Sequence, residues 1–394
     1  WDPPHRMAIR HQGLVTGVGE FVLTDIGGDT PRFMWTEALT FPWYLGGPIT
    51  EFFAAPVLSA IWKRNLARLA VVLSKLPITA AGMTINRFCS SGLQSIAIAA
   101  NQIASGQTEV AIAGGADSIS MRTRQEPGKA ELNKRLLEEK PDIFMAMGNT
   151  AEVVARRYGV SREVQDEYAL QSQQRYAAAV DAGWIAEEIV PMEATMHVVD
   201  KATGEESQAQ VTVDRDECNR PTTTLEGLAG LKPAFEDDGS VTAGNASQLS
   251  DGASMTLLMS AERAGQLGIE PMGIFRGFTV AGCEPDEMGI GPALAIPKLM
   301  KMAGINLKDI GVFEINEAFA SQAIYCIRQL GLENDMDKIN VNGGAIAIGH
   351  PIGASGARVL VSLLHEMARR DAKKGLATLC IGGGQGVALA VERD

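Results

Sequence analysis

The sequence lacks several features that would assign it to common protein classes. It has no apolar run of membrane-spanning length and no basic-then-apolar leader at its N-terminus. Its five cysteines are odd in number and form no CxxC pair, which argues against a disulfide framework or a structural zinc site. Its five histidines show no HxxxH or HExxH spacing, so we expect no metal site.

Positive charge is also scarce. The chain carries 35 basic and 47 acidic residues, a formal net charge of −12, which argues against a general nucleic-acid-binding protein. A local basic pocket for a phosphorylated ligand is still compatible with this balance. The last four residues, Val391–Asp394, match no organelle address, so we expect a cytoplasmic protein that does not bind membranes.

The chain is rich in apolar residues and in glycine. Its 394 residues exceed one ordinary core and suit two or three domains. With 46% apolar and 21% charged residues, it can bury a sizeable core. The 42 glycines cluster in short runs beside apolar segments, which indicates tight turns and close approach of backbones.

Two stretches share one plan: a reactive residue, then Ser-Gly, a helix, a strand and a glycine run. The first starts at Cys89 and continues through a helical pattern at Leu93–Ser105 and a strand at Glu109–Ala113. The second starts at His350 and continues through Ala357–Arg370 and Leu376–Ile381. We interpret the two stretches as copies of one α/β unit, although few side chains are identical.

The predicted fold class is α/β. Short apolar strands that alternate with helical periods favour buried, mixed or mostly parallel sheets covered by helices. Between the two copies the charge density rises, which indicates an inserted helical and loop-rich domain. Its expected helices cover Thr150–Tyr158 and Arg162–Ala182, and a polar loop is expected at Asp200–Arg220. The predicted domains are residues 1–118 with 241–270, the insertion 119–240, and residues 271–394.

Cys89 is a candidate nucleophile. It lies in the segment Asn86–Gly92, just before a helix of small side chains. A cysteine at a helix N-terminus faces unpaired N–H groups and the positive end of the helix dipole, and both stabilise the thiolate. A buried cysteine that only packs is about equally compatible with this position.

Three further motifs contain groups suited to catalysis. His350 lies in a glycine-rich loop before Pro351, where an imidazole suits a base better than core packing. Cys380 ends a strand before Gly382-Gly383-Gly384, whose N–H groups can converge on an oxyanion. Asn316 and Glu317 follow the apolar strand Val312–Ile315, at the end of a strand that commonly faces a crevice.

Together, in this order and at these separations, the motifs resemble the thiolase family. The similarity extends from about Asn65 to the C-terminus, about five-sixths of the chain. Further segments that carry it are Met147–Glu152, Arg220, Leu231–Phe235, Gly244–Gln248 and Met288–Pro292. The fold that this resemblance implies has two similar βαβαβαββ halves in α-β-α-β-α layers, with a loop domain inserted in the first half.

The resemblance implies a role for each motif. Cys89 carries the acyl group, and His350 takes its proton and contributes to an oxyanion hole that a water on Asn316 completes. Cys380 is the acid and base at the α-carbon, and the N–H groups of Cys89 and Gly382 form a second hole. The positions that the resemblance assigns to substrate or coenzyme A binding are Arg220, Ser247, Ala243, Met147, Met288 and Phe319.

The implied activity is that of an acyltransferase that uses coenzyme A as a substrate, with no bound cofactor, and forms a homodimer or homotetramer. Two thiolase types compete. Ala146, Ser90-Ser91 and Gln248 favour a degradative 3-ketoacyl-CoA thiolase of fatty acid β-oxidation. The segment Gly349–Gly356 resembles instead the acetyl-CoA C-acetyltransferases, which condense acetyl units.

Two other classes are less compatible with the sequence. Ketoacyl synthases share the fold but have a second histidine where this chain has Cys380. A non-catalytic, thiolase-like acyl-CoA-binding protein would have lost one of Cys89, His350 or Cys380, and none is lost.

The first sixty or so residues depart from the family. Four of the five tryptophans lie there, and the segment Phe41–Pro48 replaces the expected early helix. One hypothesis is that the stretch before Asn65 is frameshifted sequence, and the alternative is a divergent N-terminus. Peptide mass mapping of residues 1–65 distinguishes the two.

Overall fold

The computed structural model describes residues 6–11, 16–25, 31–40, 71, 74–77, 79–120, 132–199, 203–204 and 206–394, the first three ranges as backbone only. The chain divides into two compact units. The smaller unit contains an antiparallel sheet of β1 (Arg6–His11), β2 (Thr16–Asp25) and β3 (Pro31–Thr40), and a hairpin of β5 (Met192–Val199) and β6 (Glu206–Val213). The larger unit comprises Asn86–Val190 with Asp214–Asp394 and contains every predicted site residue.

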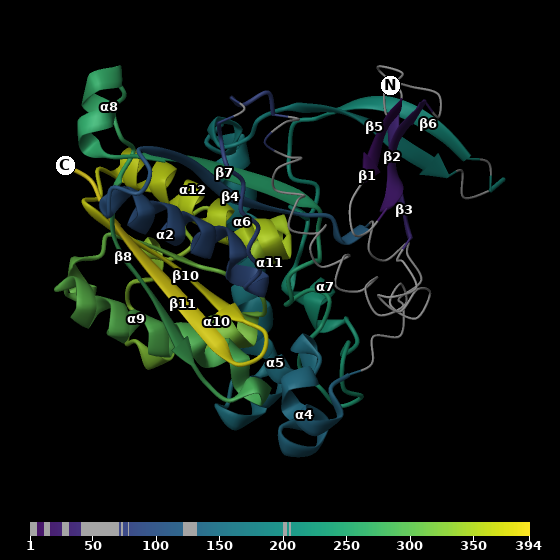
Figure 1. Cartoon of the computed structure of the whole chain (residues 1–394). Coiled ribbons are helices and arrows are strands. Elements are labelled where there is room, and N and C mark those ends of the chain that lie inside the picture. Colours follow the sequence, from purple (N-terminus) through teal and green to yellow (C-terminus); the bar gives the residue numbers. More distant parts are fainter. Residues whose placement is uncertain are drawn as a thin grey trace. The chain divides into compact units, whose positions relative to one another are not determined.

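A four-stranded mixed sheet forms the centre of the larger unit (Figure 1). Its order is β8 (Ile274–Gly282), β11 (Gln385–Glu392), β10 (Lys374–Ile381) and β9 (Val312–Ile315). Only β9 and β10 run parallel, and the other neighbours are antiparallel. The predicted strands Leu376–Ile381 and Val312–Ile315 are therefore present, the first with two more residues at its start.

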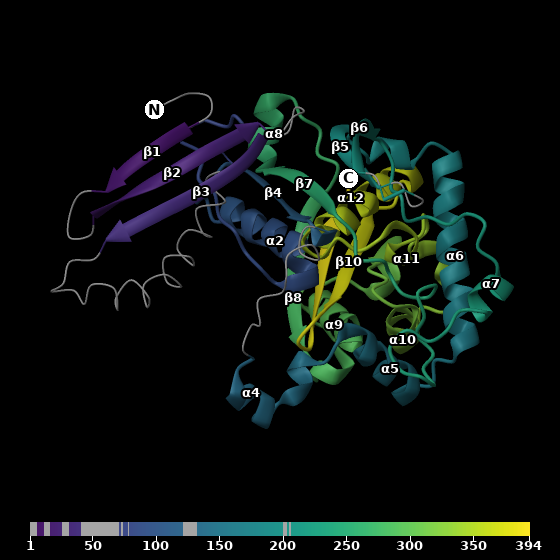
Figure 2. The same cartoon turned by 90° about the vertical axis from the view of Figure 1, so that its right-hand side faces the viewer.

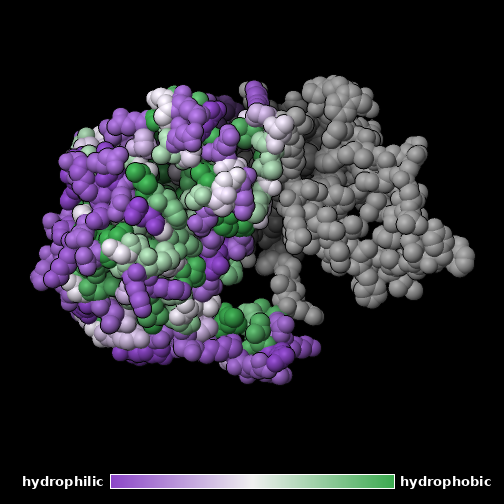
Figure 3. Space-filling view, turned by 60° about the vertical axis from the view of Figure 1, so that its left-hand side comes forward, coloured by the Kyte–Doolittle hydropathy of each residue, from purple (hydrophilic) through white to green (hydrophobic). Residues whose placement is uncertain are grey.

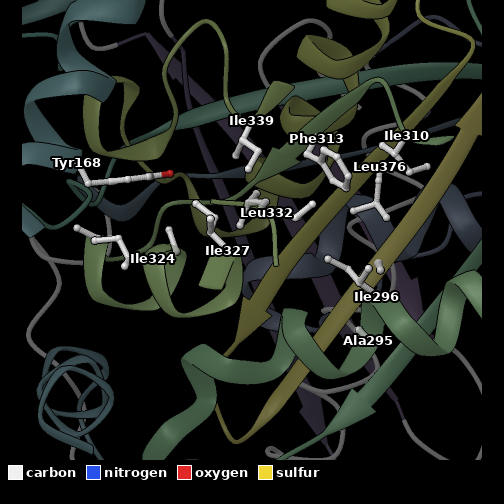
Figure 4. Close-up of a cluster of buried hydrophobic side chains, with 14 of the residues drawn as sticks. Tyr168, Ala295, Ile296, Ile310, Phe313, Ile324, Ile327, Leu332, Ile339 and Leu376 are labelled. Carbon is white, nitrogen blue, oxygen red and sulfur yellow. The ribbon is translucent and has the colours of Figure 1, made fainter. Parts of the chain in front are cut away.

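Side chains alternate between the two faces of this sheet, so each face has its own core. On one face Leu376, Ala388 and Ala390 pack against α9 (Gly291–Ala303) and α10 (Ala320–Gln329). Figure 4 shows Leu376 and Ile296 of this cluster. On the other face Ala377, Leu379 and Ile381 pack against α2 (Ser91–Ala104) and α12 (Ile352–Arg370). Figures 1 and 2 show α9 across the sheet from α2 and α12. Each fully buried Leu or Ile contributes about 1.5–3 kcal/mol.

The predicted repeat is confirmed as two helix-and-strand units that pack face to face. Helix α2 leads into β4 (Val110–Asp117) as α12 leads into β10. The two helices cross at equivalent glycines. A Cβ on Gly92 would lie 2.5 Å from the Ala357 nitrogen, and one on Gly356 would lie 2.5 Å from the Leu93 nitrogen. Only glycine allows this approach at either position.

Strand β4 pairs antiparallel with β7 (Gly252–Met259), as β10 pairs with β11. One face of this pair packs on α2 and α12. The other exposes Ile112, Met255 and Leu257, each more than half exposed. Apolar residues also lie among hydrophilic ones on the surface in Figure 3.

The region between β4 and β7 is mostly helical where it belongs to the larger unit. The predicted helices are present as α5 (Met147–Arg157) and α6 (Arg162–Asp181), and α6 runs beside α10 and α11 (Ala345–Ile348) (Figure 2). Shorter elements complete the larger unit: α4 (Lys134–Glu139), η3 (Pro141–Phe144), η4 (Ile185–Glu187), α7 (Leu225–Ala229), α8 (Ala261–Leu267), η5 (Pro285–Ile290), η6 (Leu307–Asp309) and η7 (Met336–Lys338). No helix within the described ranges is long and apolar enough to cross a membrane.

One expectation about this region is wrong. The predicted polar loop Asp200–Arg220 contains the strand β6, which pairs with β5 in register from Glu206 opposite Val199. The segment does carry a strand pattern, because apolar and polar residues alternate along Ala209–Val213. These apolar residues lie opposite Met196, Ala194 and Met192 of β5, so one face of the strand pair is apolar.

Candidate active site

The Cys89 loop is held by short-range hydrogen bonds that leave the sulfur at the start of α2. Phe88 has φ of 45° and donates its N–H to the Asn86 side chain at 2.8 Å. The N–H of Arg87 is bound by the Ser91 hydroxyl at 2.9 Å. The 3-10 turn η2 (Phe88–Ser90) follows and runs directly into α2. The sequence motif Asn-Arg-Phe-Cys-Ser-Ser-Gly therefore presents Cys89 from a tight, internally bonded turn.

The pKa of Cys89 differs from the sequence-based expectation. Burial raises it from 9.0 to about 11, while the N–H groups of Gly382 and of Cys89 itself act in the opposite direction. A helix N-terminus does favour a thiolate, but removing the sulfur from water has the larger effect here. The resting group is therefore a neutral thiol that needs a base.

Cys380 lies beside Cys89, near the end of β10. It is the seventh residue of β10 and is fully buried. Its pKa is raised well above the usual value by burial, and the nearby Cys89 adds to the effect. The turn that follows needs glycine because φ is 81° at Gly383 and 83° at Gly384. This turn aims the Gly382 N–H at the Cys89 sulfur.

A side-chain bond joins the two cysteine loops. The guanidinium of Arg87 donates to the Gln385 side chain at 2.7 Å, across 298 positions of sequence. Gln385 begins β11 directly after the glycine turn. The bond therefore fixes the Cys89 turn against the loop that carries Gly382.

His350 is positioned as a neutral base. Its Nδ1 lies 2.6 Å from the Ser355 hydroxyl, which itself donates to the Pro351 carbonyl at 3.0 Å. Because the one hydroxyl proton is committed to Pro351, Nδ1 donates to Ser355 and Nε2 carries the free lone pair. Burial lowers the pKa of His350 from 6.5 to about 4, and Asp117 opposes the shift. The imidazole is thus uncharged at neutral pH.

Several buried polar atoms lack a partner among the described residues, and His350 Nε2 and Asn316 Nδ2 are the two that belong to the predicted catalytic residues. Both residues are almost fully buried, at 4% and 3% exposed. Asn316 follows β9 and donates its own N–H to the Thr378 carbonyl, two residues before Cys380. A buried polar group without a partner costs about 1–3 kcal/mol, which is a common sign of a site that binds a ligand or a water.

Glu317 fixes the Asn316 loop from inside. Its carboxylate accepts hydrogen bonds from the Tyr168 and Ser172 hydroxyls at 3.1 and 2.7 Å, and from the Asn340 side chain at 2.9 Å. The N–H of Ile346 in α11 is a fourth donor, at 3.2 Å. Glu317 therefore joins α6, the Asn316 loop and the glycine-rich segment before His350. The sequence placed this carboxylate near a crevice, and the structure instead buries it behind the site.

Five of the six positions assigned to substrate or coenzyme A binding lie in two groups. Met147, Met288 and Phe319 share one apolar cluster with Cys380. Ser247 donates its N–H and its hydroxyl to the Ala318 carbonyl, both at 3.0 Å. Ala243 is exposed on the same loop, which the buried carboxylate of Glu152 holds through the N–H groups of residues 240 and 241.

Arg220 lies on a separate, well-anchored loop. Its guanidinium donates to three carbonyls of its own loop, those of Glu217, Cys218 and Asn219. The side-chain oxygen of Gln173 on α6 accepts the Arg220 N–H at 2.7 Å. The predicted role of Arg220 in coenzyme A binding stays a prediction. Within the described residues no group of three or more His, Cys, Asp or Glu side chains is arranged to hold a metal ion.

The comparisons with known proteins agree with this geometry. Residues 47–262 match the model "Thiolase, N-terminal domain" and residues 269–393 match "Thiolase, C-terminal domain". The predicted domain boundaries stay a prediction. A 3-ketoacyl-CoA thiolase of Bacillus subtilis is 50% identical over 83% of each chain. An acetyl-CoA acetyltransferase of Chromobacterium violaceum is 48% identical over 88% of each.

Solved structures give the same result. The dimeric peroxisomal thiolase of Saccharomyces cerevisiae superposes with a TM-score of 0.73 at 37% identity, covering 83% of this chain and 80% of that one. Human mitochondrial 3-ketoacyl-CoA thiolase in complex with CoA is 40% identical, with a TM-score of 0.73, and covers 84% of this chain and 82% of that one.

Proposed function

We propose a 3-ketoacyl-CoA thiolase activity for this chain, which belongs to the thiolase family. The protein is thus an acyltransferase whose family uses coenzyme A as a substrate and needs no bound cofactor. The observation that carries the proposal is that Cys89 lies beside Cys380, while Asp117 acts on both Cys89 and the neutral His350, whose Nε2 has no partner among the described residues.

In the first half-reaction Cys89 attacks the 3-keto carbon while its proton passes to His350 Nε2. The N–H groups of Cys89 and Gly382, which the structure aims at this sulfur, stabilise the oxyanion. The carbon–carbon bond then breaks and leaves acyl-Cys89 and an acetyl-CoA enolate. Protonated His350 is now a donor, and with a water on Asn316 it stabilises the enolate oxygen.

The thiol of Cys380 protonates the enolate carbon and releases acetyl-CoA. A thiol whose pKa is raised by burial gives a strongly basic thiolate, which suits this exchange with a carbon acid. The Cys380 thiolate takes the proton of incoming coenzyme A, whose sulfur attacks acyl-Cys89. Cys89 leaves as a thiolate and regains its proton from His350, so the two half-reactions predict ping-pong kinetics.

The degradative direction rests on three positions. Ala146 precedes Met147 at the start of α5, Ser90-Ser91 follow Cys89, and Gln248 follows Ser247. The second candidate is acetyl-CoA C-acetyltransferase, which the segment Gly349–Gly356 favours and which relatives of nearly equal identity carry as a name. A non-catalytic acyl-CoA-binding role has no feature in its favour.

The subtype is tested by steady-state thiolysis rates with acetoacetyl-CoA and with 3-ketoacyl-CoAs of increasing chain length. The proposal predicts that kcat/KM for the longer chains equals or exceeds that for the C4 substrate. Strict C4 specificity would assign the chain to the second candidate.

We also propose a homodimer or homotetramer, supported by the relative that is described as dimeric. Light scattering after size-exclusion chromatography measures this, and a monomer would contradict it. The predicted cytoplasmic location stays a prediction, since relatives named as peroxisomal are 47% identical and the bacterial ones 46–50%.

A further inference from the structure

We infer that Asp117 is a positioning residue for the catalytic pair, which binds the N-terminus of the His350 helix and stabilises the charge that His350 acquires when Cys89 is acylated. The inference rests on the proposed roles of Cys89 and His350. Asp117 lies outside every sequence motif that identified the site.

The geometry is that of a strand end bound to the opposite helix. Asp117 is the last residue of β4, and its carboxylate accepts the Gly353 N–H at 2.9 Å, across 236 positions of sequence. Gly353 is the second residue of α12, whose free N–H groups carry the positive end of the dipole. The approach is close because Gly115 and Gly353 bring backbone against backbone, where any Cβ on Gly115 would overlap the Gly353 carbonyl.

The internal repeat gives this contact a counterpart. In the second copy, the end of β10 reaches the start of α2, where the Gly382 N–H points at Cys89. In the first copy, the end of β4 reaches the start of α12, where Asp117 binds Gly353. Equivalent strand ends therefore reach the loops that carry the catalytic pair: Gly382 donates its N–H to Cys89, and the Asp117 carboxylate binds Gly353, three residues after His350.

Few charged or titratable side chains lie around His350. Apart from Asp117, the charged ones are bound by other partners. Asp251 at the start of β7 is bound by Ser118 and by Ser120, and Arg358 of α12 is bound to Asp216. The remaining groups among the described residues are Cys89 on η2, Cys380 near the end of β10, and Cys218, which lies beside the Gly349 backbone. Asp117 raises the pKa of both His350 and Cys89.

The effects of Asp117 on Cys89 and on His350 do not cancel over the catalytic cycle. While Cys89 is a thiolate, Asp117 disfavours its charge and favours the imidazolium beside it. Once Cys89 is acylated its sulfur is neutral, whereas His350 still holds the proton. From that point Asp117 acts only to stabilise protonated His350, the donor to the enolate oxygen.

The test compares Asp117→Asn with Asp251→Asn. The first keeps an oxygen for Gly353 and removes the charge, and the second removes a charge from the same edge of the sheet. We measure alkylation of Cys89 by iodoacetamide between pH 7 and 9, by peptide mass spectrometry, and kcat for thiolysis.

For Asp117→Asn the pKa of Cys89 falls, so its alkylation at pH 8 becomes about threefold to tenfold faster. Its kcat falls by about threefold to tenfold, because protonated His350 loses a stabilising charge. A Cys89 displaced into water would also alkylate faster and turn over more slowly, so the charge is tested further with Asp117→Glu, which keeps the carboxylate and should return the alkylation profile toward that of the wild type. Asp251→Asn should leave the alkylation profile in place.

An unmoved alkylation profile in Asp117→Asn, or an equal shift in Asp251→Asn, would overturn the inference. The alkylation rate reports how Asp117 affects the pKa of Cys89, and it does not depend on turnover. A failure of the proposed function would appear separately, as thiolysis that survives removal of the Cys89 sulfur. Thermal unfolding of all three variants confirms that each is folded at the assay temperature.

Discussion

The two copies of the repeat differ mainly in what joins their paired strands. In the second copy β10 and β11 are joined by the glycine turn Gly382–Gly384. In the first copy the equivalent strands β4 and β7 are separated by residues 118–251, which include the helices α5 and α6. The insertion therefore begins at the end of β4. This position corresponds to the end of β10, where Cys380 lies.

The comparison shows how one repeated unit serves two chemical roles. The short turn presents N–H groups and a buried thiol to the Cys89 sulfur. The long insertion supplies α6, whose side chains hold the loops around His350 through Glu317 and Gln173. Both copies thus provide reacting groups, Cys89 in the first and His350 and Cys380 in the second, and the insertion in the first copy provides rigidity.

Removing each cysteine in turn tests the separate chemical roles of Cys89 and Cys380. Cys89→Ala should lower thiolysis by at least about 10³-fold and also abolish exchange of labelled coenzyme A into acyl-CoA, because no acyl-enzyme forms. Cys380→Ala should lose carbon–carbon cleavage but keep that exchange, because no enolate forms in it and His350 can pass the Cys89 proton to the departing coenzyme A and take one from the incoming coenzyme A. Radiolabel exchange and thiolysis assays measure both. Equal loss of both activities in the two variants would contradict the separate roles.

Acid should destabilise the wild type through His350. Its pKa is about 4 in the fold against 6.5 in the unfolded chain, so between these values the unfolded chain binds more protons and stability falls as the pH is lowered. Over the whole pH range the free energy of unfolding falls by roughly 3 kcal/mol through this group. Urea unfolding of wild type and His350→Asn at pH 7 and pH 4.5 measures it. Equal losses in both proteins would contradict a buried neutral imidazole.

The crossing of α2 and α12 should be equally sensitive on both sides. Gly92→Ala and Gly356→Ala each place a Cβ about 2.5 Å from a backbone nitrogen, and overpacking of this kind costs about 1–3 kcal/mol. Gly265→Ala in α8 is the matched control, because a Cβ there meets nothing within 4 Å. Thermal unfolding compares the three, and a control as destabilised as the crossing variants would refute the steric explanation.

The smallest effect expected is that of Ser355→Ala. Without the hydroxyl, His350 Nδ1 loses the partner that sets its tautomer, and kcat/KM should fall by about tenfold. Ser355→Thr keeps a hydroxyl and should recover part of the loss. Thiolysis kinetics of both variants test this, and an unaffected Ser355→Ala would show that the tautomer is set without Ser355.

Local sequence patterns predicted the helices and strands that carry the catalytic residues. The segments around Cys89, His350 and Cys380 each combine a small-residue helix or apolar strand with glycines, and these signals lie within about ten residues. The strand β6 was missed although Ala209–Val213 alternates apolar and polar residues, because the charged residues on both sides of it indicated a loop. The divergent stretch before Asn65 lies mostly outside the described residues, so its two hypotheses stay open to peptide mapping.

Long-range partners could not be predicted. Ser355 lies five residues from His350 and was within reach of sequence reasoning, but Asp117 meets Gly353 across 236 positions. The pKa of Cys89 shows the same limit, since the helix dipole is a local feature and burial depends on the whole fold.

The most direct test of the central claim is to trap the acyl-enzyme. The protein is mixed with a 3-ketoacyl-CoA without free coenzyme A, quenched in acid, digested and mapped by mass spectrometry. The account predicts the acyl mass on the peptide that contains Cys89, and its absence from the Cys380 peptide. An acyl group on Cys380, or none on Cys89 while thiolysis proceeds, would contradict it.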